Sequence, residues 1–203
     1  ITGLYAGEEG WQLRGIGAVA ADIRWPFVGE LFGGIQRVTP RVQIVATPDL
    51  SNLEVPNEDS RSIELENASI FAINRFPGYD RFEDGVRMTY GGEYALDLPR
   101  FSLRTSLGQS YRLTRKPTLF PSGTGLSSRF SDVVGRTEIR YGRFLALTSR
   151  YRIDKDNLDI RRAELDLTVG SRTTYVELGY LLLDRDITLN IEDLRDREEL
   201  RAA

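Results

Sequence analysis

The residues of this sequence best suited to binding chemistry are arginines that recur at alternate positions. Alternate side chains of a β-strand share a face, so each run of such arginines lies on one side of a sheet. A guanidinium presents a planar fork of N–H donors that matches phosphate and carboxylate oxygens. The candidates for contact with a sugar phosphate are Arg87, Arg104, Arg112, Arg140, Arg150 and Arg152. A hydrated interior needs such charges anyway, so the pattern leaves both explanations open.

Other chemistries find little support in the composition. The chain contains no His, which removes Ser–His and Cys–His nucleophile pairs and the usual zinc sites. Asp154, Asp156 and Asp159 begin like a calcium loop, but the sixth position is not Gly and the twelfth, Leu165, is not Glu. We therefore predict a hairpin turn there, and expect no catalytic residues, metal or cofactor. A net charge of -3 does not indicate a basic, nucleic-acid-binding surface.

The elements that must position the arginines are β-strands with one apolar and one polar face. The clearest is 101–114, where Phe101, Leu103, Leu107 and Tyr111 alternate with polar residues. The same alternation occurs in 11–25, 34–47, 86–97, 137–141, 145–153, 163–169 and 176–182. These segments predict about eight strands.

The connections between these strands are unequal in length. Short turns at 28–33, 97–100, 142–143 and 170–172 fall at one end of the strands. The long connections, 48–84 and 115–131, fall at the other end, where only 154–157 is short. Transmembrane β-barrels show this asymmetry, and their strands need only about 10 alternating residues.

The pattern predicts an all-β fold, an antiparallel transmembrane β-barrel of which this chain forms about eight strands. We see no domain boundary within 1–203. The tail, 191–203, has the composition of a helix, although an outer loop running into a further strand is the alternative. The chain has no signal peptide and does not end in an aromatic residue, so we interpret it as an internal fragment of a larger barrel.

Two other interpretations remain open on the alternation alone. In a soluble lipocalin-like protein, the apolar face would be the core and the polar face would meet water. A complete small barrel of the porin or adhesin type would also have about eight strands. Strand length, unequal loops and the nearly uncharged apolar faces favour the membrane barrel.

Three segments resemble the LptD/OstA family of lipopolysaccharide-assembly outer-membrane proteins. Phe76–Gly91, which reads FPGYDRFEDGVRMTYG, is similar to the family's Gly-x-Asp-Arg stretch. Phe101–Arg112, with its SLGQSY core, is similar to the family's Gly-Gln-x-Tyr strand, and Val38–Gln43 to its Pro-Arg strand. Their order and spacing agree with the family from about Trp11 to Asp186.

The resemblance implies a Gram-negative outer-membrane protein with a periplasmic jellyroll followed by a barrel of about 26 strands. An LptE-like lipoprotein plugs the lumen, and lipopolysaccharide arrives over an LptA-like periplasmic bridge and leaves through a seam between the first and last strands. An inner-membrane ATPase supplies the energy, so the barrel is not an enzyme. We expect this chain to be a middle wall of that barrel in contact with outer-membrane lipid, without the jellyroll or the seam. The long 48–84 loop is expected to fold toward the lumen.

Overall fold

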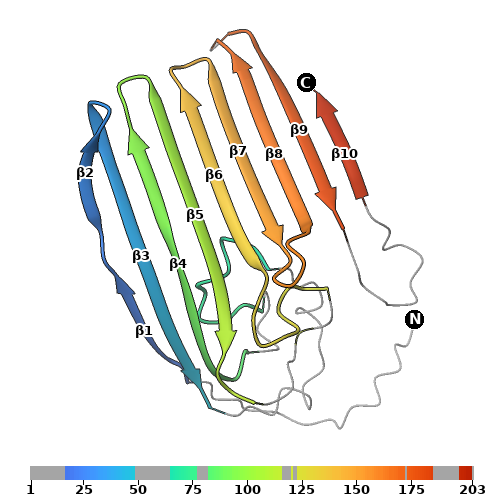
Figure 1. The fold of residues 1–203 in the computed structure, drawn as a ribbon. Coiled ribbons are helices and arrows are strands. Elements are labelled where there is room, and N and C mark those ends of the chain that lie inside the picture. Colours follow the sequence, from blue (N-terminus) through green and yellow to red (C-terminus); the bar gives the residue numbers. More distant parts are fainter. Residues whose placement is uncertain are drawn as a thin grey trace, which may run out of the picture.

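One antiparallel sheet of ten strands makes up the fold (Figure 1). The computed structural model describes residues 17–48, 65–76, 82–115, 120, 123–171, 173–184 and 197–202. The strands are β1 (Val19–Arg24), β2 (Phe27–Leu31), β3 (Gly34–Thr47), β4 (Gly85–Asp97), β5 (Phe101–Arg112), β6 (Val133–Tyr141), β7 (Leu145–Ile153), β8 (Ile160–Gly170), β9 (Tyr175–Leu183) and β10 (Arg197–Ala202). The prediction of an all-β antiparallel fold is confirmed.

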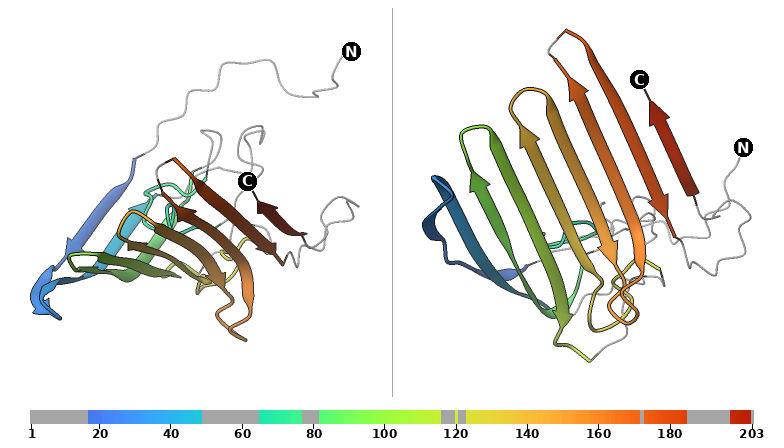
Figure 2. Two further views of the ribbon diagram at one scale, coloured as in Figure 1. Left: turned by 90° about the horizontal axis from the view of Figure 1, so that it is seen from above. Right: turned by 45° about the horizontal axis from the view of Figure 1, so that its top comes forward.

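The sheet is a curved, open trough (Figure 2). Strands that follow one another in the chain pair side by side from β3 to β10, and both β1 and β2 pair with β3. In the part of the chain that the structure describes, the two edges of the sheet do not pair with each other, so the trough is not closed into a barrel.

Alternation gives the sheet one apolar and one polar face, as predicted. Direct cross-strand pairing joins one apolar row across six strands, made of Leu96, Leu103, Ile139, Leu147, Leu167 and Leu178. The neighbouring positions, such as Arg104 opposite Glu138, belong to the other face. A period of two fixes the face of every residue once the register is set.

The predicted count of about eight strands is low by two. Pro26 has no N–H and interrupts the first strand, but pairing resumes with β2, which includes residues 28–31 that were predicted as a turn. The helix predicted for the tail is wrong over 197–202, where β10 pairs with β9. Pairing with an existing strand overrides weak local helix preference. The predictions for 11–16 and 191–196 lie outside the described residues.

Short turns lie at one end of the sheet and longer connections at the other, as predicted (Figure 1). The tight turns include left-handed backbone at Phe32, Gly33 and Gly142. Residues 154–159 form the short hairpin turn at the opposite end, where the Asp154 carboxylate accepts the N–H of Asp156 at 2.8 Å. The sheet therefore has a first rim of tight turns and a second rim of longer loops.

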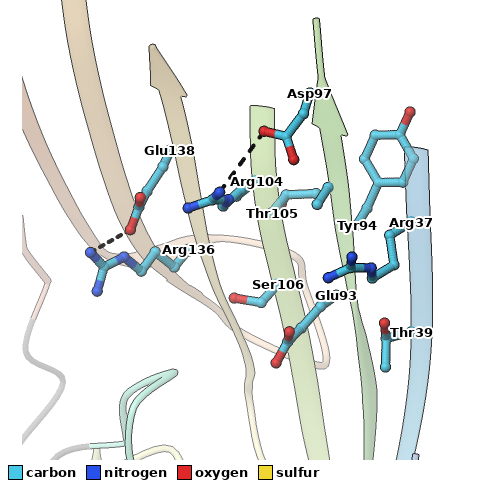
Figure 3. Close-up of a pocket in the computed structure, with 11 residues that line it drawn as sticks. Arg37, Thr39, Glu93, Tyr94, Asp97, Arg104, Thr105, Ser106, Arg136 and Glu138 are labelled. Carbon is cyan, nitrogen blue, oxygen red and sulfur yellow. Dashed lines mark ion pairs between the residues drawn. The ribbon is translucent and has the colours of Figure 1, made fainter. Parts of the chain in front are cut away.

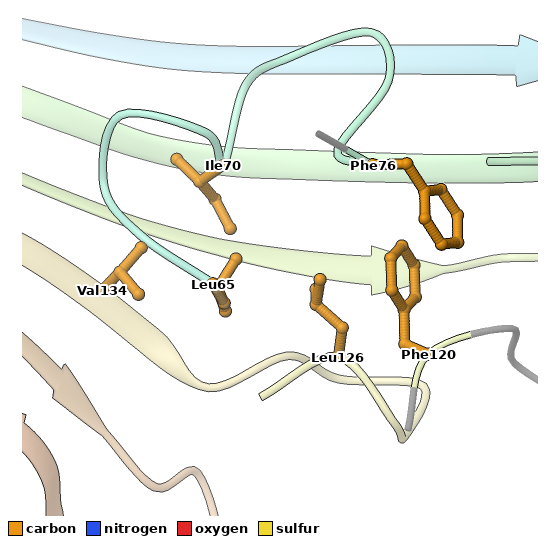
Figure 4. Close-up of a cluster of buried hydrophobic side chains, with 6 residues drawn as sticks. All are labelled: Leu65, Ile70, Phe76, Phe120, Leu126 and Val134. Atoms are coloured by element: carbon orange, nitrogen blue, oxygen red, sulfur yellow. The ribbon is translucent and has the colours of Figure 1, made fainter. Parts of the chain in front are cut away.

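The loops at the second rim fold back over the polar face and bury a hydrophobic cluster there (Figure 4). We call residues 65–76, 120 and 123–132 the clasp. The cluster consists of clasp residues and one strand residue: Leu65, Ile70, Phe76, Phe120, Leu126 and Val134. Phe76 and Phe120 stack with ring centroids 4.7 Å apart. Residues 65–76 therefore lie on the polar face, as the family resemblance implies.

A glycine lets the clasp approach the sheet closely. A Cβ added at Gly108 of β5 would lie only 3.2 Å from Ile70 Cγ2, inside normal contact. Beside it, Asn67 Nδ2 donates to Ser106 Oγ at 3.0 Å. Arg41 of β3 places its guanidinium carbon 3.9 Å from the centre of the Phe71 ring. The clasp is fixed to β3, β5 and β6 by both apolar and polar contacts.

Candidate functional site

The six predicted arginines all lie on the polar face of the sheet. Arg87 is directly opposite Arg112, and Arg104 is opposite Glu138. Arg140, Arg150 and Arg152 occupy the same face of β6 and β7 by their register. The structure divides the six into three that are held against the clasp and three that lie elsewhere on the polar face, of which Arg150 borders a small cavity beside the clasp. Their contact with a sugar phosphate or a plug stays a prediction.

Arg87, Arg112 and Arg152 lie against the clasp. Arg87 is buried and its Nη2 donates to the carbonyl oxygens of Ala72 at 2.5 Å and Ile73 at 2.7 Å. Arg152 is also buried, with its Nε 3.6 Å from the carboxylate of Asp132. These guanidinium groups hold the clasp onto the sheet.

A buried charge cluster reinforces this attachment. Glu83 is almost fully buried and forms ion pairs with Arg75 and, at 3.1 Å, with Arg87. Arg75 Nε donates to the same carboxylate at 2.7 Å. Burial raises the pKa of Glu83, but the charges and hydrogen bonds of Arg75 and Arg87 outweigh it and hold that pKa below its usual range. Glu83 is therefore ionised, and its single negative charge is shared between two buried cations.

Arg104, Arg140 and Arg150 lie on the polar face away from this charge cluster. Arg104 borders a cleft of about 260 Å³ on β3 to β6, which Figure 3 shows. Guanidinium and carboxylate groups alternate around the cleft, from Arg37, Arg104, Arg136, Glu93, Asp97 and Glu138. The Arg104–Asp97 pair is long, at 3.9 Å, and its side chains are more than half exposed. Such pairs rearrange easily in water, so this part of the trough is a hydrated, mixed-charge surface.

The sequence analysis missed several residues of the polar face. Arg136 lies on β6, which begins at Val133, four residues before the predicted strand. Continuing the alternation back from Glu138 would have included it. Arg75 and Glu83 lie outside the strands, where no periodic signal exists to connect them.

The apolar face has no protein layer over it in the described residues. Leu107, Leu165 and Leu178 remain 45%, 36% and 40% exposed, and Val169 and Val176 are 44% and 53% exposed. In a soluble sandwich or lipocalin-like protein these side chains would be the core. A contiguous exposed apolar surface of this kind marks a membrane or protein contact.

The described residues contain neither a candidate metal site nor a membrane-spanning helix. No cluster of three or more acidic side chains among them could hold a metal ion. Within the same ranges, no helix is long and apolar enough to span a bilayer. At the hairpin turn, hydrogen bonds from the N–H groups of Asp156 and Asn157 and from Arg161 lower the pKa of Asp154 despite partial desolvation. That carboxylate is used to form the turn.

Comparisons with known proteins agree with this arrangement. The model of the family described as "LPS transport system D" (LptD) matches residues 2–202. The LPS-assembly protein LptD of Ralstonia nicotianae is 30% identical over 164 residues, which is 76% of this chain and 20% of that protein. Its counterpart in Burkholderia thailandensis is 26% identical over 81% of this chain and 22% of that protein. The chain thus spans about a fifth of the length of the curated relatives it matches.

Proposed function

Since the chain belongs to the LptD family, we propose that it forms part of the wall of an outer-membrane β-barrel that assembles lipopolysaccharide into the outer leaflet. Its partners are lipopolysaccharide, the lipids of the Gram-negative outer membrane, an LptE-like lipoprotein plug and an LptA-like periplasmic bridge. The barrel transports its cargo without catalysing a reaction.

The observation that carries this proposal is the exposed apolar face behind a polar trough. Hydrocarbon tails accept the apolar row from Leu103 to Leu178 without loss of hydrogen bonds. On the other face, the mixed charges beside Arg104 suit a hydrated cargo with phosphate and hydroxyl groups. A saccharide headgroup can therefore pass over the trough while its acyl chains stay in lipid.

The strand edges support a barrel larger than this sheet. β1 and β10 each present an edge that no described strand pairs. Unpaired backbone groups are too costly in hydrocarbon, so spanning sheets close on themselves. In a larger barrel, further strands of the same protein pair with both edges, and the trough becomes one side of the lumen.

Depletion of the protein in its host tests the proposed function. Intact cells are stained with an antibody to the saccharide of lipopolysaccharide, and newly made surface material is followed as the protein is depleted. We expect surface lipopolysaccharide to fall and to recover when the wild-type gene is supplied. If surface lipopolysaccharide stays constant while the uptake of small solutes falls, the porin-type function is correct instead.

A spectroscopic experiment tests which face meets lipid. A single fluorophore is attached through cysteine at position 165 or at position 168, on opposite faces of β8, in the complete natural chain in vesicles. A bromine-labelled lipid should quench the probe at Leu165→Cys and leave the probe at Thr168→Cys bright. The opposite result would place the polar face in lipid and contradict the proposed orientation.

A further inference from the structure

A small cavity lies between the clasp and strands β6, β7 and β8, and its charged lining is strongly basic. Its volume is about 110 Å³. Four guanidinium groups border it, from Arg136, Arg150, Arg152 and Arg162, against a single carboxylate, that of Glu66. This ratio differs from the open cleft beside Arg104, where cations and anions are equal in number.

The register of the sheet places these arginines directly opposite one another. Arg136 of β6 pairs with Arg150 of β7, and Arg152 of β7 pairs with Arg162 of β8. Like charges at directly opposed positions destabilise a sheet. Carboxylates beside the arginines offset part of this repulsion, with Glu138 next to Arg136, Glu164 and Asp166 next to Arg150, and Asp132 next to Arg152.

Neighbouring carboxylates occupy only part of the donor capacity of the central pair. Arg136 Nη2 lies 2.6 Å from Glu138, while its Nε is buried and has no hydrogen-bond partner among the described residues. Arg150 contacts Glu164 at 3.0 Å and Asp166 at 3.4 Å through the same nitrogen, Nη1. A guanidinium has five N–H donors, so both groups retain donors beside the cavity.

The carboxylate on the cavity wall is itself paired. Glu66 lies 3.0 Å from Arg162 Nη1, which offsets its repulsion of an anion. Arg162 also contacts Glu164 of its own strand. The hydrogen-bond donors that remain for a ligand therefore come from Arg136 and Arg150.

We propose that this cavity binds a tetrahedral oxyanion, either inorganic phosphate or the phosphate group of a phosphorylated sugar, between Arg136 and Arg150. Paired guanidinium forks match the oxygens of such an anion. The bound anion relieves the repulsion between the facing arginines and satisfies the buried Nε of Arg136. Because the clasp forms one wall of the cavity, the anion also stabilises the clasp on the sheet. This site goes beyond the proposed transport function and does not depend on it.

Binding of inorganic phosphate tests the proposal directly. The complete natural chain is purified in a non-ionic detergent, and its thermal unfolding is followed in sodium phosphate and in sodium chloride of equal ionic strength. Phosphate should raise the melting temperature, and phosphorus NMR should show broadening of the phosphate signal by the protein. Arg136→Gln and Arg150→Gln should each weaken binding by roughly tenfold or more. Arg24→Gln, on the same face of β1, outside the cavity and with a side chain 57% exposed, is the matched control and should bind as the wild type does.

A variant that is expected to strengthen phosphate binding keeps the test decisive if the arginine variants do not fold. Glu66→Gln removes the carboxylate on the cavity wall and should strengthen phosphate binding. Glucose 1-phosphate, titrated in parallel, identifies the source of the group: binding of both compounds supports a sugar-phosphate ligand, and binding of inorganic phosphate alone supports a free ion. The proposal is overturned if phosphate has no more effect than chloride on the wild type, or if Glu66→Gln leaves phosphate affinity unchanged.

Discussion

Glu83→Gln should loosen the clasp without disturbing the sheet. The side chains of Glu83, Arg75 and Arg87 are each only 3% exposed, and the carboxylate is the shared partner of both cations. Removing one member of a buried ion pair leaves uncompensated charge and costs about 3–5 kcal/mol. Here two guanidinium groups lose that partner, so we expect a cost of at least about 3 kcal/mol.

Hydrogen exchange measures this cost locally. The backbone N–H of Ile70 donates to the carbonyl oxygen of Glu66 at 3.0 Å, and that of Ala72 donates to the carbonyl oxygen of Ser69 at 2.9 Å. Both amides are therefore protected when the clasp is closed. About 3 kcal/mol corresponds to more than roughly 100-fold faster exchange through clasp opening. The measurement uses mass spectrometry of a peptide covering 65–76 from the complete chain in detergent.

The matched control is Asp166→Asn. Asp166 also pairs with an arginine, at 3.4 Å from Arg150, but its side chain is 62% exposed. Exposed pairs contribute about 0–1 kcal/mol, so this variant should leave exchange in 65–76 nearly unchanged. Unaltered exchange in Glu83→Gln, or equal acceleration of the β8 peptide, would refute the role assigned to the buried cluster.

The pH dependence of hydrogen exchange in 65–76 tests the role of the Glu83 charge independently. The folded-state pKa of Glu83 lies below its usual value of 4.5. Its stabilisation is therefore complete above pH 4.5 and is lost as the pH falls through the lower folded-state pKa. Burial raises the pKa of Asp132, with Arg152 only partly opposing, so Asp132 acts in the opposite direction. The difference between wild type and Glu83→Gln isolates the contribution of Glu83, and it should shrink on acidification.

Three further substitutions test the faces and the clasp. Leu167→Arg places charge on the apolar face and should cost about 2–4 kcal/mol in vesicles, whereas Thr168→Arg on the trough side should cost less, as measured by urea titration of the folded gel-mobility form. Ile70→Ala, at a fully buried site, should destabilise the clasp by about 2–5 kcal/mol in hydrogen exchange, and Ile73→Ala, at a half-exposed site, by under about 1 kcal/mol. Gly108→Val should displace the clasp from β5 and accelerate proteolysis of 65–76, because its Cβ would meet Ile70 at 3.2 Å.

The alternation of the sequence predicted the sheet because face assignment is a local property. In β5, each residue from Phe101 to Arg112 lies on the face that a period of two assigns to it. The helix predicted for the tail was wrong because local composition decided that prediction. The composition of 197–202 favours a helix, and only pairing with β9 makes the segment extended. The turn predicted at 28–33 is wrong over 28–31, because pairing with β3 resumes directly after Pro26.

The clasp could not be predicted because the contacts that hold it on the sheet are non-local. Leu65, Phe120 and Val134 meet only after the strands between them have paired. The ion pair between Arg75 and Glu83 likewise joins two irregular segments that carry no periodic pattern. Alternation placed Arg87 on the polar face, but nothing in the sequence indicated that clasp carbonyls would occupy it.

The position of the hydrophobic cluster has a consequence for the order of biogenesis. The sheet side of the cluster, made by Gly108 and Val134, exists only after β5 and β6 have come together. The entropic cost of ordering residues 65–76 is therefore offset by packing only after the strands have paired, so the clasp closes late in folding. A maturing molecule with an unlocked clasp would be open to quality-control proteases. Resistance of this segment to cleavage would then signal that assembly of the neighbouring wall is complete.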